Sequence, residues 1–104
     1  MKALDLSKES PRSPKVVLGG YAIAARTLDK CRAEIAGTID DYIYGCPLDQ
    51  TFFNFTGISS EDFKEFVATG ADDEVVAAWI EENAEEHTEE EMTAWNGRLL
   101  PDLD

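Results

Sequence analysis

The stretch GCPLDQTFFNFTGIS, residues 45–59, decides more of the fold than any other segment of this chain. Pro47 suits the first position of a helix, where its missing N–H costs nothing, and Asp49 in the first turn favours the positive helix end. Gly57 is placed where a helix commonly ends in a left-handed residue. Apolar residues between them recur at helical spacing, namely Leu48, Phe52 and Phe55. We therefore predict a helix that starts at Pro47, stops at Gly57 and packs one face into a core.

Similar signals for the end of one helix and the start of the next recur on either side of this helix. Thr56-Gly57-Ile58-Ser59 is echoed by Thr69-Gly70-Ala71-Asp72, which predicts helices over residues 60–69 and 73–83. Upstream, residues 21–36 carry an apolar stripe and are followed by a glycine; the stripe consists of Ala24, Leu28, Cys31 and Ile35. Downstream, Thr88 and Glu91 form a capping box that opens a fifth helix.

The N-terminal segment lacks the helical pattern of the segments described above. Pro11 and Pro14 prevent a helix, so residues 1–18 are predicted to form an extended arm on a helical body of residues 19–100. Residues 38–45 are rich in isoleucine and tyrosine and could pair with residues 15–18 as a short two-stranded ribbon. The expected fold is thus mainly α, a compact bundle of about five short helices with an extended arm. A chain of 104 residues argues for one domain, residues 1–104.

Charge is unevenly distributed along the chain. The formal net charge is −13, with seven basic and four acidic residues in positions 1–37, and two basic and eighteen acidic residues in positions 38–104. Such an acidic body repels nucleic acid, so no nucleic-acid partner is expected. No apolar run approaches the length of a membrane span and no apolar leader is seen, so we expect a cytoplasmic protein without membrane contact and with reduced thiols.

Standard catalytic and cofactor motifs are not found, and no cofactor is predicted. Cys46 is expected to precede the helix that begins at Pro47, a position that favours the nucleophilic thiolate, but no general base is placed near it. His87 is expected to be an exposed side chain in a solvated acidic turn, with metal binding disfavoured. The turn Leu18-Gly19-Gly20-Tyr21 could present amide groups to an anion, against the plainer interpretation of a simple turn.

One functional neighbourhood can be assembled from these observations. We expect the arm to fold back on the body, with Arg12 paired to a carboxylate near the start of the helix at Pro47, Asp49 being favoured. Polar groups at chain turns are where sites tend to form. The candidate ligand-binding residues are Arg12, Tyr21, Cys46, Asp49 and Gln50, with no catalytic or metal-binding residue assigned.

Several blocks of the sequence together resemble a known family. They are Pro11-Arg12-Ser13-Pro14, Leu18-Gly19-Gly20-Tyr21, Asp29-Lys30, Ala36-Gly37, Cys46-Pro47-Leu48-Asp49 and Phe55-Thr56-Gly57-Ile58. Over roughly residues 4–80 the chain is similar to small bacterial proteins described only as a domain of unknown function. The resemblance implies a compact, stand-alone bacterial protein and supplies no activity.

Two functions remain open at this point. The first is a non-catalytic binding module that meets a protein partner through its arm or its acidic face. The second is a small-molecule-binding protein or enzyme with a site around Arg12, Tyr21, Cys46 and Asp49. A concave pocket lined by several of these side chains would favour the second. A solid core with Arg12 and Asp49 only paired to each other would favour the first.

Overall fold

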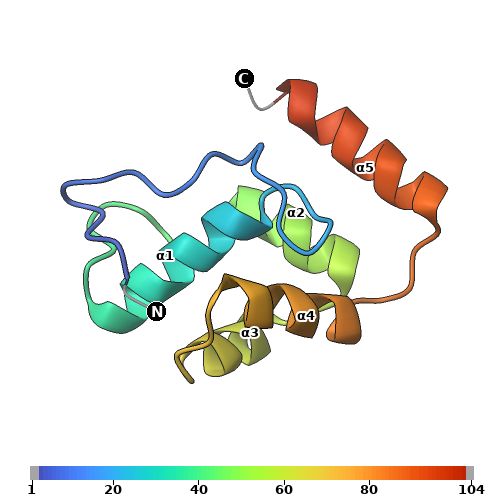
Figure 1. Cartoon of the computed structure of the whole chain (residues 1–104). Coiled ribbons are helices and arrows are strands. Elements are labelled where there is room, and N and C mark those ends of the chain that lie inside the picture. The colour runs from blue at the N-terminus through green and yellow to red at the C-terminus, as the bar shows by residue number, and fades with distance from the viewer. Residues whose placement is uncertain (1–2, 103–104) are drawn as a thin grey trace.

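The computed structural model describes the backbone of residues 3–102 and the side chains of residues 3–97. These residues form five helices joined by short connections (Figure 1). The helices are α1 Ala24–Ala36, α2 Pro47–Thr56, α3 Ser60–Val67, α4 Asp73–Asn83 and α5 Glu89–Asp102. The prediction of a mainly α bundle of about five short helices is confirmed, and the last helix continues two residues beyond the expected end of the body.

Helix boundaries follow the local signals in the sequence. α2 begins directly after Cys46 and ends at Gly57, which is left-handed with φ 76°. The Ser59 side chain accepts a hydrogen bond from the Asp62 N–H at the start of α3. At the start of α4, the Asp72 side chain accepts a hydrogen bond from the Val75 N–H. Each cap satisfies a backbone donor that has no partner inside its own helix, so each boundary is specified by neighbouring residues alone.

α1 begins later than the sequence pattern predicts. Leu18 and Tyr21 exchange two backbone hydrogen bonds of 3.0 Å across Gly19 and Gly20, both of which have positive φ. This tight turn uses the backbone carbonyl of Tyr21, which a helix beginning at that residue would need for its first hydrogen bond. Ile23 then takes an unusual left-handed conformation, with φ 74°, and the helix starts at the next residue.

The arm runs along α1 in the opposite direction and meets both of its ends (Figure 1). Near the start of α1, the Ile23 N–H donates to the Pro14 carbonyl. Beyond its end, the Leu6 N–H donates to the Thr38 carbonyl at 2.8 Å, and the Thr38 hydroxyl donates to the Leu4 carbonyl at 2.7 Å. The suggested ribbon of residues 15–18 with 38–45 is wrong. Over residues 3–102 the one β-bridge joins Leu18 to Tyr21, because residues 4–6 take the position beside Thr38.

The core lies where α1 meets α2, α3 and α4. Its largest fully buried apolar side chains are Phe52, Phe63, Ile23, Leu28 and Ile80. Cys31 is fully buried and unpaired, as its place on the stripe predicts. Ile35 departs from the prediction and is 42% exposed, since it borders an open hollow at the end of α1 instead of packing into the core.

A stack of three rings holds the C-terminal part of the chain to α2. Phe55 lies between His87, with ring centroids 3.9 Å apart, and Trp95, at 4.5 Å. His87 also shares a hydrogen bond of 2.7 Å with the Phe55 carbonyl oxygen. The expectation of an exposed His87 is therefore wrong, since its side chain is 14% exposed. The segment between α4 and α5 is thereby fixed against α2 rather than left in solvent.

Candidate functional site

Arg12 joins the arm to two helices. Its Nε and Nη2 donate to the two carboxylate oxygens of Asp29 at 3.0 Å each, and its Nη1 donates to Asp73 at 2.7 Å. Arg32 donates to the same Asp73 carboxylate at 2.9 Å. Partial burial raises the pKa of Asp73, but hydrogen bonds from Arg12 and Arg32 outweigh it and hold that pKa below its usual value. The expected docking of the arm through Arg12 is thus confirmed, but the expected partner, Asp49, is wrong.

Asp49 has a different cation, which comes from α1. The Lys30 Nζ donates to Asp49 at 2.8 Å, with both side chains almost completely buried. The Thr27 hydroxyl donates to the other carboxylate oxygen at 2.8 Å, and the Gly45 N–H donates at 2.9 Å. The Lys30 ammonium also donates to the Cys46 sulfur at 3.0 Å. Every lone pair that Asp49 turns toward the core is therefore used inside the protein.

The remaining two candidates lie apart from each other. Gln50 is exposed, and its side-chain amide donates to the Gly45 carbonyl at 3.2 Å, which closes the turn before α2. Tyr21 is 5% exposed and contacts Phe52, Phe55 and Trp95 edge to face. The five candidates therefore divide into three places: Arg12 with the arm, Tyr21 in the aromatic core, and the others at the start of α2. None of the five main hollows in the described part of the chain is lined by more than one of them.

Sequence reasoning missed the three charged residues of α1 that organise these contacts. Asp29, Lys30 and Arg32 are 5%, 2% and 7% exposed, although Asp29 and Arg32 lie off the apolar stripe. A partial signal is that the four alanines of this helix, Ala24, Ala25, Ala33 and Ala36, cover about half of its circumference, so that neighbouring segments can approach it closely. Charged side chains that such neighbours cover are buried and need partners.

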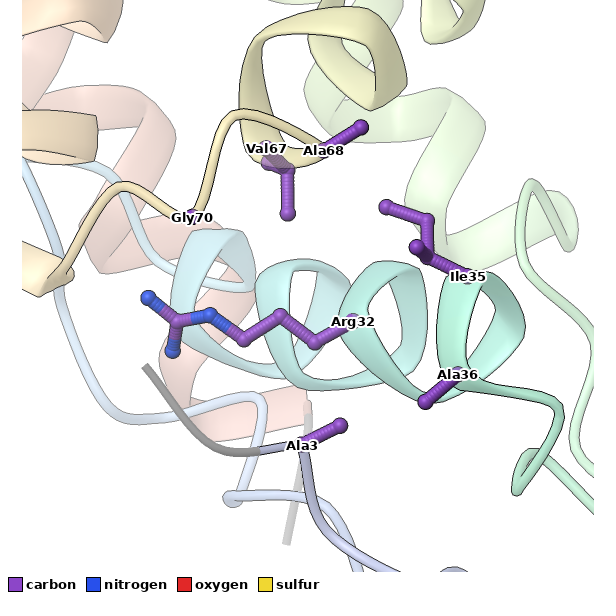
Figure 2. A pocket seen from close by; sticks show the side chains of 7 residues that line it. All are labelled: Ala3, Arg32, Ile35, Ala36, Val67, Ala68 and Gly70. Carbon is purple, nitrogen blue, oxygen red and sulfur yellow. The ribbon is translucent and has the colours of Figure 1, made fainter.

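One hollow lies between the arm, α1 and the end of α3, with a volume of about 210 Å³ (Figure 2). Ile35, Ala36 and Val67 give it aliphatic walls. Arg32 also borders it, but Figure 2 shows its guanidinium group extended toward the chain near Gly70. That group donates to Asp73 and to the Ala71 carbonyl, so its charge is already paired. The hollow is small and offers mainly aliphatic contacts.

A second, larger hollow of about 420 Å³ lies over the Gly19–Gly20 turn. We call it the turn hollow. It is lined by the turn, Tyr21, Ala84 and Met92, and by four residues at the end of α4 and in the segment that follows. We call these four the rim residues; they are Glu81, Glu85, Glu86 and His87. The plain turn, the interpretation favoured over an anion site, agrees better with these surroundings. The Tyr21 N–H donates within the turn, and three glutamates border the space above it.

The walls of the turn hollow are fixed by hydrogen bonds from three directions. Asn96 of α5 accepts from the Ala22 N–H at 3.0 Å and donates to the Gly20 carbonyl at 2.8 Å. The Glu85 N–H donates to the Thr56 carbonyl at 2.7 Å. Gly19 is required in the lining because its φ is +61° and a Cβ there would lie 3.2 Å from the Ala77 carbonyl oxygen. The hollow is therefore formed before any ligand arrives.

The described residues also bear on metal binding and membrane crossing. No cluster of three or more histidine, cysteine, aspartate or glutamate side chains that could hold a metal ion occurs in the described part of the chain. None of the helices there combines the length and the apolar character that crossing a bilayer requires.

Comparison with known protein families identifies a match. The family model described as Domain of unknown function (DUF5069) matches residues 8–102, which is nearly the whole chain. No curated protein matches the sequence.

Proposed function

The chain belongs to the DUF5069 family, a domain of unknown function, and we propose that it is a non-catalytic protein-binding module whose acidic surface receives a basic partner. The acidic surface is defined by the three rim glutamates of the turn hollow, Glu81, Glu85 and Glu86. The proposal places the protein in the bacterial cytoplasm, in keeping with its two free thiols.

The observation that carries the proposal is how the described cations are distributed. Arg12, Lys30 and Arg32 are bound to carboxylates that lie between the arm and helices α1, α2 and α4. Lys64 pairs with Glu34 at 3.1 Å. Among the described side chains, no cation lies within ion-pair distance of the three rim glutamates. Their charge is therefore available to a partner, and it acts beside a preformed concave surface.

The alternative, a small-molecule site or an active site around the five candidate residues, has less support. Its two charged members, Arg12 and Asp49, each already lie within 3.0 Å of an oppositely charged side chain of another residue. A substrate would have to break these contacts to bind them. Buried side-chain nitrogen and oxygen atoms in the described residues all have hydrogen-bond partners, so no unsatisfied buried group awaits a ligand there. A binding module needs none of these groups and uses the outer surface.

Affinity capture from a cell lysate with two charge-matched triple variants tests this proposal. The first variant, E81Q/E85Q/E86Q, removes the rim charges. The control, E61Q/E65Q/E74Q, removes three exposed acidic charges from α3 and α4. Each changes the net charge by the same amount, so general acidity is held constant between them.

We expect quantitative mass spectrometry to show basic proteins that are captured by the wild type and the control and lost from the rim variant. Capture should weaken with added salt, because charge pairing at an exposed rim is screened. Equal retention by both variants, or equal loss from both, would contradict the proposal. Thermal unfolding of the three proteins checks that the rim substitutions leave the fold intact.

A further inference from the structure

We propose that the turn hollow receives one lysine side chain of the basic partner, with its ammonium group between the Tyr21 hydroxyl and the Glu81 carboxylate. This inference rests on the proposed function and adds to it the site and the chemistry of recognition. It also gives a role to the hydroxyl of Tyr21, which makes no hydrogen bond within the described residues.

The hydroxyl of Tyr21 is the first step of the argument. The residue is 5% exposed and its ring is held edge to face by Phe52, Phe55 and Trp95. Its hydroxyl nevertheless makes no hydrogen bond to any described residue. By contrast, the hydroxyl of Tyr44, another partly buried tyrosine, donates to the Ser60 carbonyl at 2.6 Å. Since no buried side-chain oxygen of the described residues lacks a partner, this hydroxyl reaches solvent, and Tyr21 borders the turn hollow, so its oxygen can accept a hydrogen bond from a group bound there.

Glu81 lines the same hollow as Tyr21 and supplies a negative charge there. Burial raises the pKa of Tyr21, and the negative charge of Glu81 raises it further. Because both residues border one hollow, a cation that enters it can meet a hydroxyl lone pair and a carboxylate.

The shape of the turn hollow favours lysine. Its lining includes Gly20, Ala84 and Met92, which can cover the methylene groups of a long side chain. An ammonium group is a compact charge with three donors, which suits acceptors that belong to different side chains. A guanidinium group prefers the two parallel oxygens of one carboxylate. The remaining rim charges, Glu85 and Glu86, would lie near basic residues that flank the bound lysine.

A peptide titration tests this proposal on the full chain. The probe is acetyl-Gly-Gly-Lys-Gly-Gly-amide, followed by the backbone amide signals of the ¹⁵N-labelled protein. Companion peptides replace the lysine with norleucine or arginine, and spermidine represents a free amine. We expect the lysine peptide to shift Gly19, Gly20 and Ala84 signals, and to bind more tightly than the norleucine and arginine peptides.

Two substitutions with matched controls locate the ammonium group. E81Q should weaken the binding of the lysine peptide about 2- to 5-fold, the range expected for one exposed charge. E82Q removes the adjacent glutamate of α4, which does not line the hollow, and should weaken it less. Y21F keeps the packed ring and removes the unused hydroxyl, so it should leave the thermal midpoint unchanged and weaken binding about 2- to 10-fold.

The proposal is overturned if norleucine binds as well as lysine, if E82Q matches E81Q, or if Y21F binds the peptide normally. Tighter binding of spermidine than of the lysine peptide would overturn the assignment of a protein ligand. These results are distinguishable from failure of the proposed function. If the rim triple variant loses basic partners while the lysine peptide shifts signals elsewhere, the lysine site fails and the acidic binding surface stands.

Discussion

The buried ion pair between Lys30 and Asp49 provides the sharpest stability prediction. Asp49→Asn keeps the size of the side chain but removes its charge. The Lys30 ammonium, 3% exposed as a side chain, would then lose its carboxylate and keep as close acceptors the Cys46 sulfur and the new amide oxygen. Removing one member of a buried pair costs about 3–5 kcal/mol, because the other charge is left buried without compensation.

This cost is large for a chain of this size. Folded proteins are stable by about 5–15 kcal/mol, so the variant would lose a substantial part of the total. At about 4–8 °C per kcal/mol, the thermal midpoint should fall by roughly 12–40 °C. The assay is urea denaturation followed by circular dichroism, with the free energy of unfolding obtained by linear extrapolation.

A second pair in the same protein serves as the control. Glu34→Gln breaks the contact of 3.1 Å with Lys64, whose side chain is 44% exposed. It should cost less than about 1 kcal/mol, because solvent screens an exposed pair. The double variant K30M/D49N should cost less than the sum of its two single variants, since neither charge is then left alone. A loss for Asp49→Asn no larger than that for Glu34→Gln would refute the reasoning.

Three further predictions follow from local geometry and titration. Gly57→Val should lower stability by about 1–2 kcal/mol in thermal unfolding, because the position has φ +76° and a β-branched residue is strongly disfavoured there. Burial raises the pKa of Cys31 to about 12, so a thiol reagent at pH 8 should modify only Cys46 in the native protein and both thiols after unfolding. The pKa of Asp73 is lowered in the folded state, so its contribution to stability should be present above its ordinary pKa of 3.8 and be lost as the pH falls through the lowered value. Arg12→Met should make acid unfolding shallower in that range, and an unchanged acid limb would contradict this.

Helix boundaries could be predicted because their causes are local. Gly57, Ser59 and Asp72 act on backbone groups within a few residues, and the structure has all three where the pattern indicates. α1 shows the limit of the same approach. Its apolar pattern starts at Tyr21, but the tight turn at Gly19 and Gly20 uses the backbone groups of that residue first.

The choice of ion-pair partners could not be predicted in the same way. The sequence indicated that Arg12 would meet a carboxylate, and eighteen acidic residues after position 37 offered many choices. Which one it meets depends on how α1 and α4 approach the arm, and Asp29 and Asp73 come together only in the folded chain. Asp49 was the favoured partner of Arg12. It pairs instead with Lys30, because Lys30 lies on the face of α1 that meets α2.

The acidic surface has one property that the sequence predicts and one that only the folded structure reveals. The excess of negative charge is evident from composition, and its availability to a partner is not. That availability depends on which cations the fold has already paired, and on the ring stack of His87 with Phe55 that holds the rim in place. Tyr21 was a candidate because it follows a turn, but its unused hydroxyl is visible only in three dimensions.

Carbodiimide cross-linking tests the central claim most directly. This reagent joins a carboxylate to an amine without a spacer, and it reports which glutamates of the wild-type protein contact lysines of other proteins in a cell lysate. We predict that intermolecular cross-links are concentrated at Glu81, Glu85 and Glu86, with few at the comparably exposed Glu61 and Glu65. Cross-links spread evenly over all exposed carboxylates, or absent from the rim, would contradict a specific acidic binding surface.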